Sequence, residues 1–161
     1  MQFAYRKNRS VEDAISVALH FVYEHLDRGN TYVRMLFVDY TSAFNTIVPA
    51  TLVCKLQSLG LCDAVCEWVF NFLSLRPQRV RIGHRLSDEI VISTGSPQGC
   101  ILSPLLFSLC TFDCTSNADS NLVIKYADDT TIIGQISDND ESKYRAEVKC
   151  LEVWSKATTF S

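Results

Sequence analysis

Three aspartates in this chain stand where apolar strands are expected to end, and together they could hold divalent metal ions. Asp128 and Asp129 are adjacent within "VIKYADDTTIIG", which is otherwise rich in β-branched and apolar residues. Taken locally, the pair fits a solvated hairpin turn, because Asp is a favoured turn residue. Asp39 follows the apolar run "LFV" on a separate predicted strand. Three carboxylates on neighbouring strand ends would repel one another unless cations neutralised them.

The ligand chemistry of such a site favours magnesium. Carboxylate oxygens suit Mg²⁺, which binds through one or two carboxylates together with substrate phosphates. Two such ions a few Å apart can activate an attacking oxygen and stabilise a leaving one. The residue types therefore indicate metal-assisted phosphoryl or nucleotidyl transfer, and they leave the substrate open.

Composition and charge set the broad class of protein. The chain has 161 residues, of which 47% are hydrophobic and 20% charged, enough for one globular domain. Its net charge of −3 argues mildly against a dedicated nucleic-acid-binding domain, which is more often basic. Seven cysteines without a CxxC pair indicate reduced thiols rather than a zinc site. Reduced thiols suit a reducing compartment, so we expect an intracellular protein, nuclear or cytoplasmic. No signal peptide or membrane span is recognised.

Hydrophobic periodicity and turn residues predict alternating helices and strands. The expected helices are 10–29, 49–60, 64–74, 104–116 and 137–156. The expected strands are 31–40, 79–83, 89–93, 122–127 and 130–136, the first of them buried. The second and third strands flank the turn 83–88, and the last two form a hairpin around the aspartate pair. This order predicts an α+β fold with helices on one face of a largely antiparallel sheet.

Three segments carry a family resemblance. "FVDYTSAFNTI" (37–47), "GSPQGCILSPLLF" (95–107) and "KYADDTTIIG" (125–134) resemble motifs A, B and C of reverse transcriptases, most closely those of LINE-type, non-LTR retrotransposons. The flanks 2–15 and 147–155 are also similar to that domain, so the likeness covers essentially the whole chain. It implies fingers and palm, with an antiparallel palm sheet backed by helices. Residues 1–161 would form a partial domain, truncated before the end of motif D, the primer grip and the thumb.

The resemblance assigns a metal site. Asp39 and Asp128 would be the main ligands of two Mg²⁺ ions, for which Mn²⁺ is a substitute. Asp129 completes the catalytic triad as a less direct ligand. Tyr40 stands where the family's main-chain carbonyl tends to touch a metal ion.

The resemblance also assigns nucleotide-binding residues. Phe44 matches the aromatic steric gate that crowds a ribose 2′-OH, although without the motif it would be interpreted as a core aromatic. Gln98 and Gly99 match the motif B pair that lies against the incoming nucleotide and the template. Arg6 stands near the position of an arginine that contacts the triphosphate.

A basic cluster follows the third predicted helix. Phosphate contacts need only local positive patches, even on an acidic protein. The alternative is a solvated charged face. The arginines that would track the template or primer backbone are Arg76, Arg79, Arg81 and Arg85.

Three functions remain open at this point. The first is an RNA-directed DNA polymerase that adds dNTPs to a primer 3′-OH, with an RNA template and a DNA primer as partners, no membrane and no deducible protein partner. The second is an inactive retrotransposon remnant with at most weak nucleic-acid binding. The third is an RNA-templated RNA polymerase, against which the "SPQG" segment and Phe44 argue.

Overall fold

The computed structural model describes residues 1–40 and 42–158, which belong to two compact units. The sheet unit combines the first 40 residues with residues 111–158, and the helix–hairpin unit contains residues 42–110. The sheet unit holds, in chain order, α1 (Val11–Leu26), β1 (Thr31–Val38), β6 (Asn121–Tyr126), β7 (Asp129–Ser137) and α5 (Ser142–Thr158).

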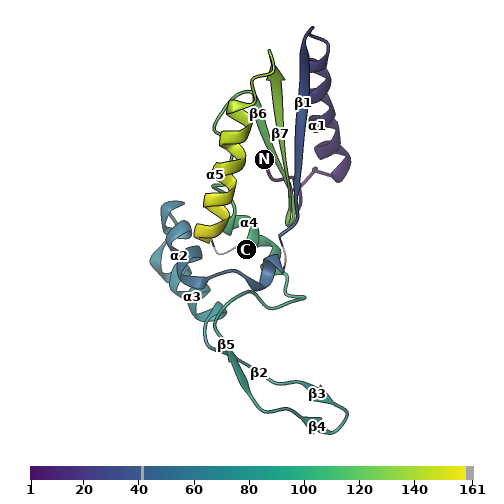
Figure 1. The fold of residues 1–161 in the computed structure, drawn as a ribbon. Helices are drawn as coiled ribbons and strands as arrows, with labels where there is room; N and C mark the ends of the chain where they lie inside the picture. The colour runs from purple at the N-terminus through teal and green to yellow at the C-terminus, as the bar shows by residue number, and fades with distance from the viewer. Residues whose placement is uncertain (41, 159–161) are drawn as a thin grey trace. The chain divides into compact units, whose positions relative to one another are not determined.

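The sheet of the first unit is antiparallel, with strand order β1-β7-β6. Adjacent residues of β7 point to opposite faces, and both faces are apolar. Ile133 packs with α1 residues such as Ala14, whereas Ile132 packs with α5 residues such as Leu151. Figure 1 shows α1 and α5 on opposite sides of the sheet. The α+β prediction is confirmed, but the expectation of helices on one face only is wrong, because both faces of β7 carry buried apolar side chains.

Strand β1 is less buried than predicted. It is an edge strand that pairs with β7 on one side only. Its side chains Met35 and Phe37 are 41% and 71% exposed. The apolar run therefore does form a strand, but the prediction that this strand is buried is wrong.

The starts of the first and the last helix follow from local chemistry. Ser10 caps α1: its hydroxyl accepts from the Asp13 amide, and the Asp13 carboxylate accepts from the Ser10 amide at 2.7 Å. Helix α5 starts five residues later than predicted, because Asp138 and Asn139 adopt left-handed backbone angles in the preceding turn.

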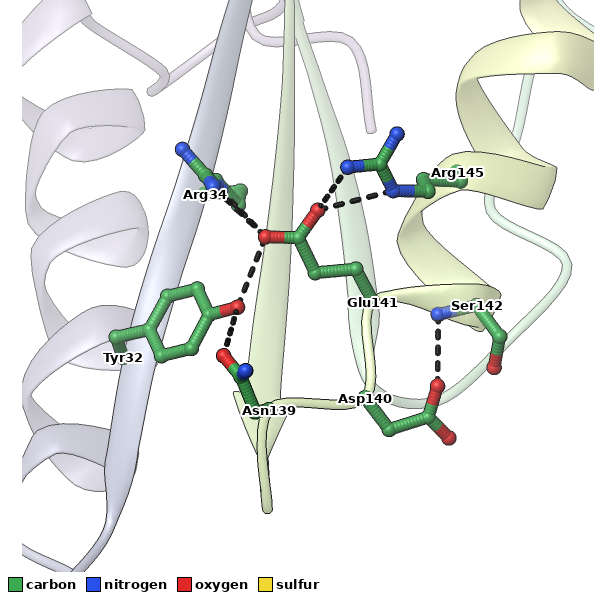
Figure 2. A network of polar contacts seen from close by, with 7 residues as sticks. All are labelled: Tyr32, Arg34, Asn139, Asp140, Glu141, Ser142 and Arg145. Atoms are coloured by element: carbon green, nitrogen blue, oxygen red, sulfur yellow. Dashed lines mark hydrogen bonds and ion pairs between the residues drawn. The ribbon is translucent and has the colours of Figure 1, made fainter.

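The start of α5 is tied to β1 by the Glu141 carboxylate (Figure 2). Arg34 of β1 donates to it through Nε at 2.9 Å, and the Tyr32 hydroxyl donates at 2.8 Å. Arg145, one turn along α5, donates through Nε at 3.0 Å. The side chain of Glu141 is only 13% exposed. This network fixes the first turn of α5 against the edge strand.

The helix–hairpin unit contains three helices, a short 3-10 segment and an exposed arm. The helices are α2 (Pro49–Ser58), α3 (Asp63–Leu73) and α4 (Leu102–Cys110), and the 3-10 segment is η1 (Ala43–Asn45). Leu52, Leu56 and Leu73 are fully buried within this unit. Among the described residues, no helix is both long and apolar enough to cross a membrane.

The arm is a long hairpin whose pairing differs from the prediction. Strand β2 (Arg76–Gln78) pairs with β5 (Ile90–Ile92), and β3 (Arg81–Ile82) pairs with β4 (Arg85–Leu86) at the tip. The segments 79–83 and 89–93 were expected to flank a single turn. Pro77 lies within β2, because a two-stranded ladder leaves edges where its missing N–H is tolerated. Figure 1 shows the arm projecting away from α2 and α3.

Candidate functional site

The three predicted metal-binding aspartates are brought to one end of the sheet. Asp39 directly follows Val38, which pairs with Thr130. Asp129 precedes Thr130 as the first residue of β7 and pairs with Tyr126. Strands β1 and β7 therefore place Asp39 and Asp129 at the same end of the sheet. The predicted hairpin around the aspartate pair is confirmed.

Asp128 lies in the two-residue turn that connects β6 to β7. Its partner in the turn is Ala127, whose φ of 56° is in the left-handed region that residues with a Cβ rarely adopt. The carbonyl of Ala127 accepts a hydrogen bond from Gln2 Nε2 at 3.3 Å. Asp128 is half-buried, whereas Asp39 and Asp129 are exposed. This end of the sheet thus carries one partly sheltered carboxylate, Asp128, and two open ones, Asp129 and Asp39.

The N-terminal segment runs beside this turn. Gln2 forms a parallel bridge with Lys125, and the Phe3 amide donates to the Lys125 carbonyl at 2.9 Å. Burial raises the pKa of Tyr5, and the negative charge of Asp128 raises it further. Neither Gln2 nor Tyr5 was singled out from the sequence, because their proximity to the turn depends on the strand-like path of residues 1–4. No local pattern would have indicated it.

Arg6, the predicted triphosphate contact, directly follows Tyr5 and is exposed. Its Nη1 donates to the carbonyl of Gln2 at 3.5 Å. The segment therefore brings the Arg6 guanidinium into the neighbourhood of Asp128 within the same unit. The positive charge of this guanidinium attracts anionic ligands. The triphosphate role remains a prediction.

The ring of Tyr40 and its main-chain carbonyl have different roles. Its ring is buried and lies 6.4 Å from the Trp154 ring, centroid to centroid, on the α5 side of the sheet. Burial, and secondarily the neighbouring Cys114, raises the pKa of the phenol to about 12. The metal role predicted for Tyr40 concerns its main-chain carbonyl, and the ring serves the core.

The chemistry of the donor set fits a hard divalent cation. Carboxylate and carbonyl oxygens are the ligands that Mg²⁺ prefers, and the three aspartates supply them without any soft ligand. Within residues 1–40 and 42–158, no three His, Cys, Asp or Glu side chains lie close enough together to hold a metal ion. To bind a metal ion together, the three carboxylates would have to move closer to one another.

The helix–hairpin unit carries Phe44 in η1. The Phe44 ring packs on Phe107 of α4, with ring centroids 5.2 Å apart and planes inclined at 50°. Its main-chain carbonyl accepts from the Ser96 amide at 2.8 Å. The contact expected of a core aromatic is thus observed, and the steric-gate role stays a prediction. The residue is half-buried, so part of the ring remains accessible.

Gln98 and Gly99 lie in the exposed loop before α4. Gln98 lines a cavity of about 710 Å³ together with other polar side chains, including Asn45 and Gln78. Gly99 has a φ of +75°, in the left-handed region that glycine adopts more readily than other residues. This backbone angle explains why a glycine occupies the position. Gln98 therefore lines the same cavity as Asn45 of η1 and Gln78 at the base of the arm, all within one unit.

The four predicted nucleic-acid arginines fall into two environments. Arg76 is half-buried, and its guanidinium donates to main-chain carbonyls of the same unit. Arg79, Arg81 and Arg85 are exposed on the arm. Arg79 forms an exposed ion pair with Glu89 at 3.1 Å. The exposed three have the accessibility that phosphate contacts require.

A family model described as reverse transcriptase (RNA-dependent DNA polymerase) matches residues 1–161. The chain belongs to the reverse transcriptase family. Its curated relatives include the RNA-directed DNA polymerase from the mobile element jockey of Drosophila funebris, 27% identical over 139 residues. The probable RNA-directed DNA polymerase from transposon BS of Drosophila melanogaster is 28% identical over 140 residues. Each alignment covers 82% of this reverse transcriptase chain and 15% of the relative.

A third relative belongs to another element. The Pol polyprotein from the type-1 retrotransposable element R2 of Popillia japonica is 24% identical over 90 residues, which is 56% of this chain and 15% of the relative. These relatives confirm the predicted likeness to non-LTR retrotransposon polymerases. The chain thus spans about a seventh of the length of the curated relatives it matches.

Solved structures confirm the fold of this reverse transcriptase chain. Apo telomerase of Candida tropicalis, truncated from its C-terminal domain, aligns with a TM-score of 0.67 at 12% identity. The alignment covers 94% of this chain and 33% of the telomerase chain. A second structure, apo telomerase of the same species, gives a TM-score of 0.64 at 14% identity, with 96% and 31% coverage. The predicted fingers–palm type of α+β fold is confirmed.

Proposed function

We propose that this chain is the fingers–palm part of an RNA-directed DNA polymerase that adds dNTPs to a primer 3′-OH on an RNA template. The observation that carries the proposal is the position of Asp39, Asp128 and Asp129 at one end of the antiparallel sheet. Membership of the reverse transcriptase family and the names of the curated relatives support the reaction class.

The aspartates would hold two Mg²⁺ ions, with the Tyr40 carbonyl as an additional ligand. Bound there, the ions would supply activation of the primer oxygen and neutralisation of the phosphates. The protein itself supplies carboxylates at fixed strand ends. Asp128 follows Ala127 in the two-residue turn, and the Ala127 carbonyl accepts a hydrogen bond from Gln2. Binding of the ions would draw the three carboxylates closer together around the incoming triphosphate.

The remaining residues would bind and orient the substrates. Arg6 would contact the triphosphate, because it lies on the segment that passes the Asp128 turn. The Phe44 ring would crowd a ribose 2′-OH, and Gln98 with Gly99 would lie against the nucleotide and the template. Exposed arginines on the arm would contact the phosphate backbone of the template or primer.

Primer extension on a homopolymer RNA template tests the proposal. An oligo(dT) primer on poly(rA), with dTTP and Mg²⁺, is offered to the chain and to a longer version that continues with the downstream part of its reading frame. Asp128→Asn should reduce extension by on the order of a thousandfold, because one carboxylate ligand becomes a neutral amide. Asp119→Asn, at an exposed loop position, is the matched control and should leave extension unchanged.

The outcomes separate the open functions. Extension by the longer version, abolished by Asp128→Asn and by EDTA, supports the polymerase. If neither version extends the primer, the polymerase proposal is contradicted and the inactive remnant is the remaining interpretation. Extension that prefers ribonucleotides on the same template would instead support an RNA polymerase.

A further inference from the structure

Arg76 differs from the other arm arginines in what its guanidinium contacts. Nη2 donates to the carbonyls of Thr94 at 2.6 Å and Gly95 at 2.8 Å, and Nε donates to the carbonyl of Leu73 at 3.1 Å. One planar side chain thus joins the last residue of α3 to the start of the loop 94–99. The side chain is half-buried, and three of its N–H groups point to protein oxygens.

The opposite side of the same loop rests on the segment around η1. The Gly95 amide donates to the Ile47 carbonyl at 2.7 Å, and the Ser96 amide donates to the Phe44 carbonyl at 2.8 Å. A Cβ at Gly95 would lie 2.7 Å from Asn45 Cα, so only glycine permits this approach. The loop is therefore clamped between Arg76 and the segment that carries Phe44.

We propose that Arg76 is a positioning residue that holds the loop 94–99 against the Phe44 segment, and that it does not serve as a phosphate contact. The role of Gln98 and Phe44 in nucleotide binding rests on the proposed function. The clamp itself does not, since all its bonds lie within the helix–hairpin unit. Through it, Arg76 would set where Gln98 stands relative to Phe44.

The chemistry explains why an arginine is needed. The guanidinium is a rigid planar fork that can donate to several carbonyls in fixed directions, whereas a lysine ammonium is a compact charge on a flexible stem. Lysine can replace arginine at a phosphate contact that needs mainly charge, but it cannot reproduce this fork. Arg76→Lys therefore separates the two roles, and Arg76→Gln removes both the charge and the fork.

Amide hydrogen exchange measured residue by residue by NMR tests the clamp without requiring activity. In Arg76→Lys and Arg76→Gln, the Gly95 and Ser96 amides should exchange roughly tenfold faster, because the loop opens more often. The Leu52 amide of α2, which donates to the carbonyl of Val48 just before the helix, reports the folding of the same unit and should not change. Arg85→Gln, at the exposed tip of the arm, is the matched control and should leave the loop amides unchanged.

Unchanged loop amides in both Arg76 variants would overturn the proposal. Equal acceleration of Gly95, Ser96 and Leu52 would also overturn it, because the effect would then be a general loss of stability.

A salt titration of RNA binding adds a second readout. Arg85→Gln should lower the slope of log affinity against log salt by about 0.7, and Arg76→Gln should leave it unchanged. A lowered slope in Arg76→Gln, restored by Arg76→Lys, would assign Arg76 to a phosphate.

Primer extension distinguishes this inference from the proposed function. Absence of extension in the wild-type longer version overturns the polymerase, while the amide exchange still decides the clamp. If the longer version is active, Arg76→Lys should raise the KM for dTTP by roughly tenfold with little change in kcat, since misplacing Gln98 weakens nucleotide binding. An unchanged KM would contradict the positioning role.

Discussion

Gly134 of β7 and Tyr144 of α5 approach so closely that a Cβ at Gly134 would lie 2.5 Å from Tyr144 Cδ2 and 2.9 Å from Tyr144 Cβ. Gly134→Ala should therefore lower the free energy of unfolding by about 1–3 kcal/mol, because the helix must move away from the sheet. Urea denaturation followed by circular dichroism measures this. Gly29→Ala is the control, since nothing lies within 4 Å of a Cβ there. Equal stability of the two variants would show that α5 does not pack on β7 as described.

The Glu141 network should make stability depend on acid pH. Hydrogen bonds from Arg34, then Tyr32 and Arg145, lower the pKa of Glu141 from 4.5 to about 2. Because folding favours the ionised carboxylate, its stabilisation is fully present above about pH 4.5 and is lost as the pH falls towards 2.

Glu141→Gln should therefore be less stable than the wild type at pH 7, with a difference that shrinks steadily between pH 4.5 and 2. The midpoint of urea unfolding measured across this range checks the prediction. Glu89→Gln, which breaks an exposed ion pair with Arg79, is the control and should have little effect at any pH. A Glu141→Gln curve that runs parallel to the wild type would contradict the lowered pKa.

If the longer version is active, Phe44 allows a test of sugar selection. Phe44→Val should reduce the preference for dTTP over UTP by at least about tenfold, about 1.4 kcal/mol, because a smaller side chain leaves room for a 2′-OH. Phe72→Val is the matched control, since Phe72 is a half-buried aromatic of α3 that stacks on Trp68. The ratio of kcat/KM values for the two nucleotides is the measurement. Unchanged discrimination would leave Phe44 as a core residue that packs on Phe107.

The exposed arm should contribute salt-dependent affinity for nucleic acid. Arg81→Ala and Arg85→Ala should each weaken RNA binding and lower the slope of log affinity against log salt by about 0.7 for a single strand. Fluorescence anisotropy with a labelled RNA at several salt concentrations measures both quantities. Arg28→Ala, which removes an exposed arginine paired with Glu24 on the helix α1, is the control. Equal losses in all three variants would indicate nonspecific charge attraction rather than an arm contact.

The sequence predicted most elements because their signals are local. The capping box at Ser10 and Asp13 and the proline at the start of α2 define helix starts without tertiary information. The aspartate pair at 128 and 129 was correctly placed on a hairpin, since Asp is favoured in turns and apolar runs flank it.

The remaining features depend on contacts between distant segments. The exposure of Phe37 follows from the edge position of β1, which no property of the strand's own residues reveals. The approach of Gln2 and Tyr5 to the turn at Asp128 depends on pairing across more than 120 residues. Arg76 was grouped with the arm arginines by charge, but its carbonyl partners Thr94 and Gly95 come from the far side of the hairpin.

The most direct test of the account is whether Asp39, Asp128 and Asp129 form one divalent-metal site. Mn²⁺ added at low millimolar concentration should broaden the NMR amide signals of these three residues and of Ala127, since a paramagnetic ion relaxes nearby nuclei. Asp128→Asn should greatly reduce this broadening, whereas Asp119→Asn should leave it unchanged, and excess Mg²⁺ should compete it away. Broadening that is absent, or that persists equally in Asp128→Asn, would contradict the metal site and with it the proposed polymerase chemistry.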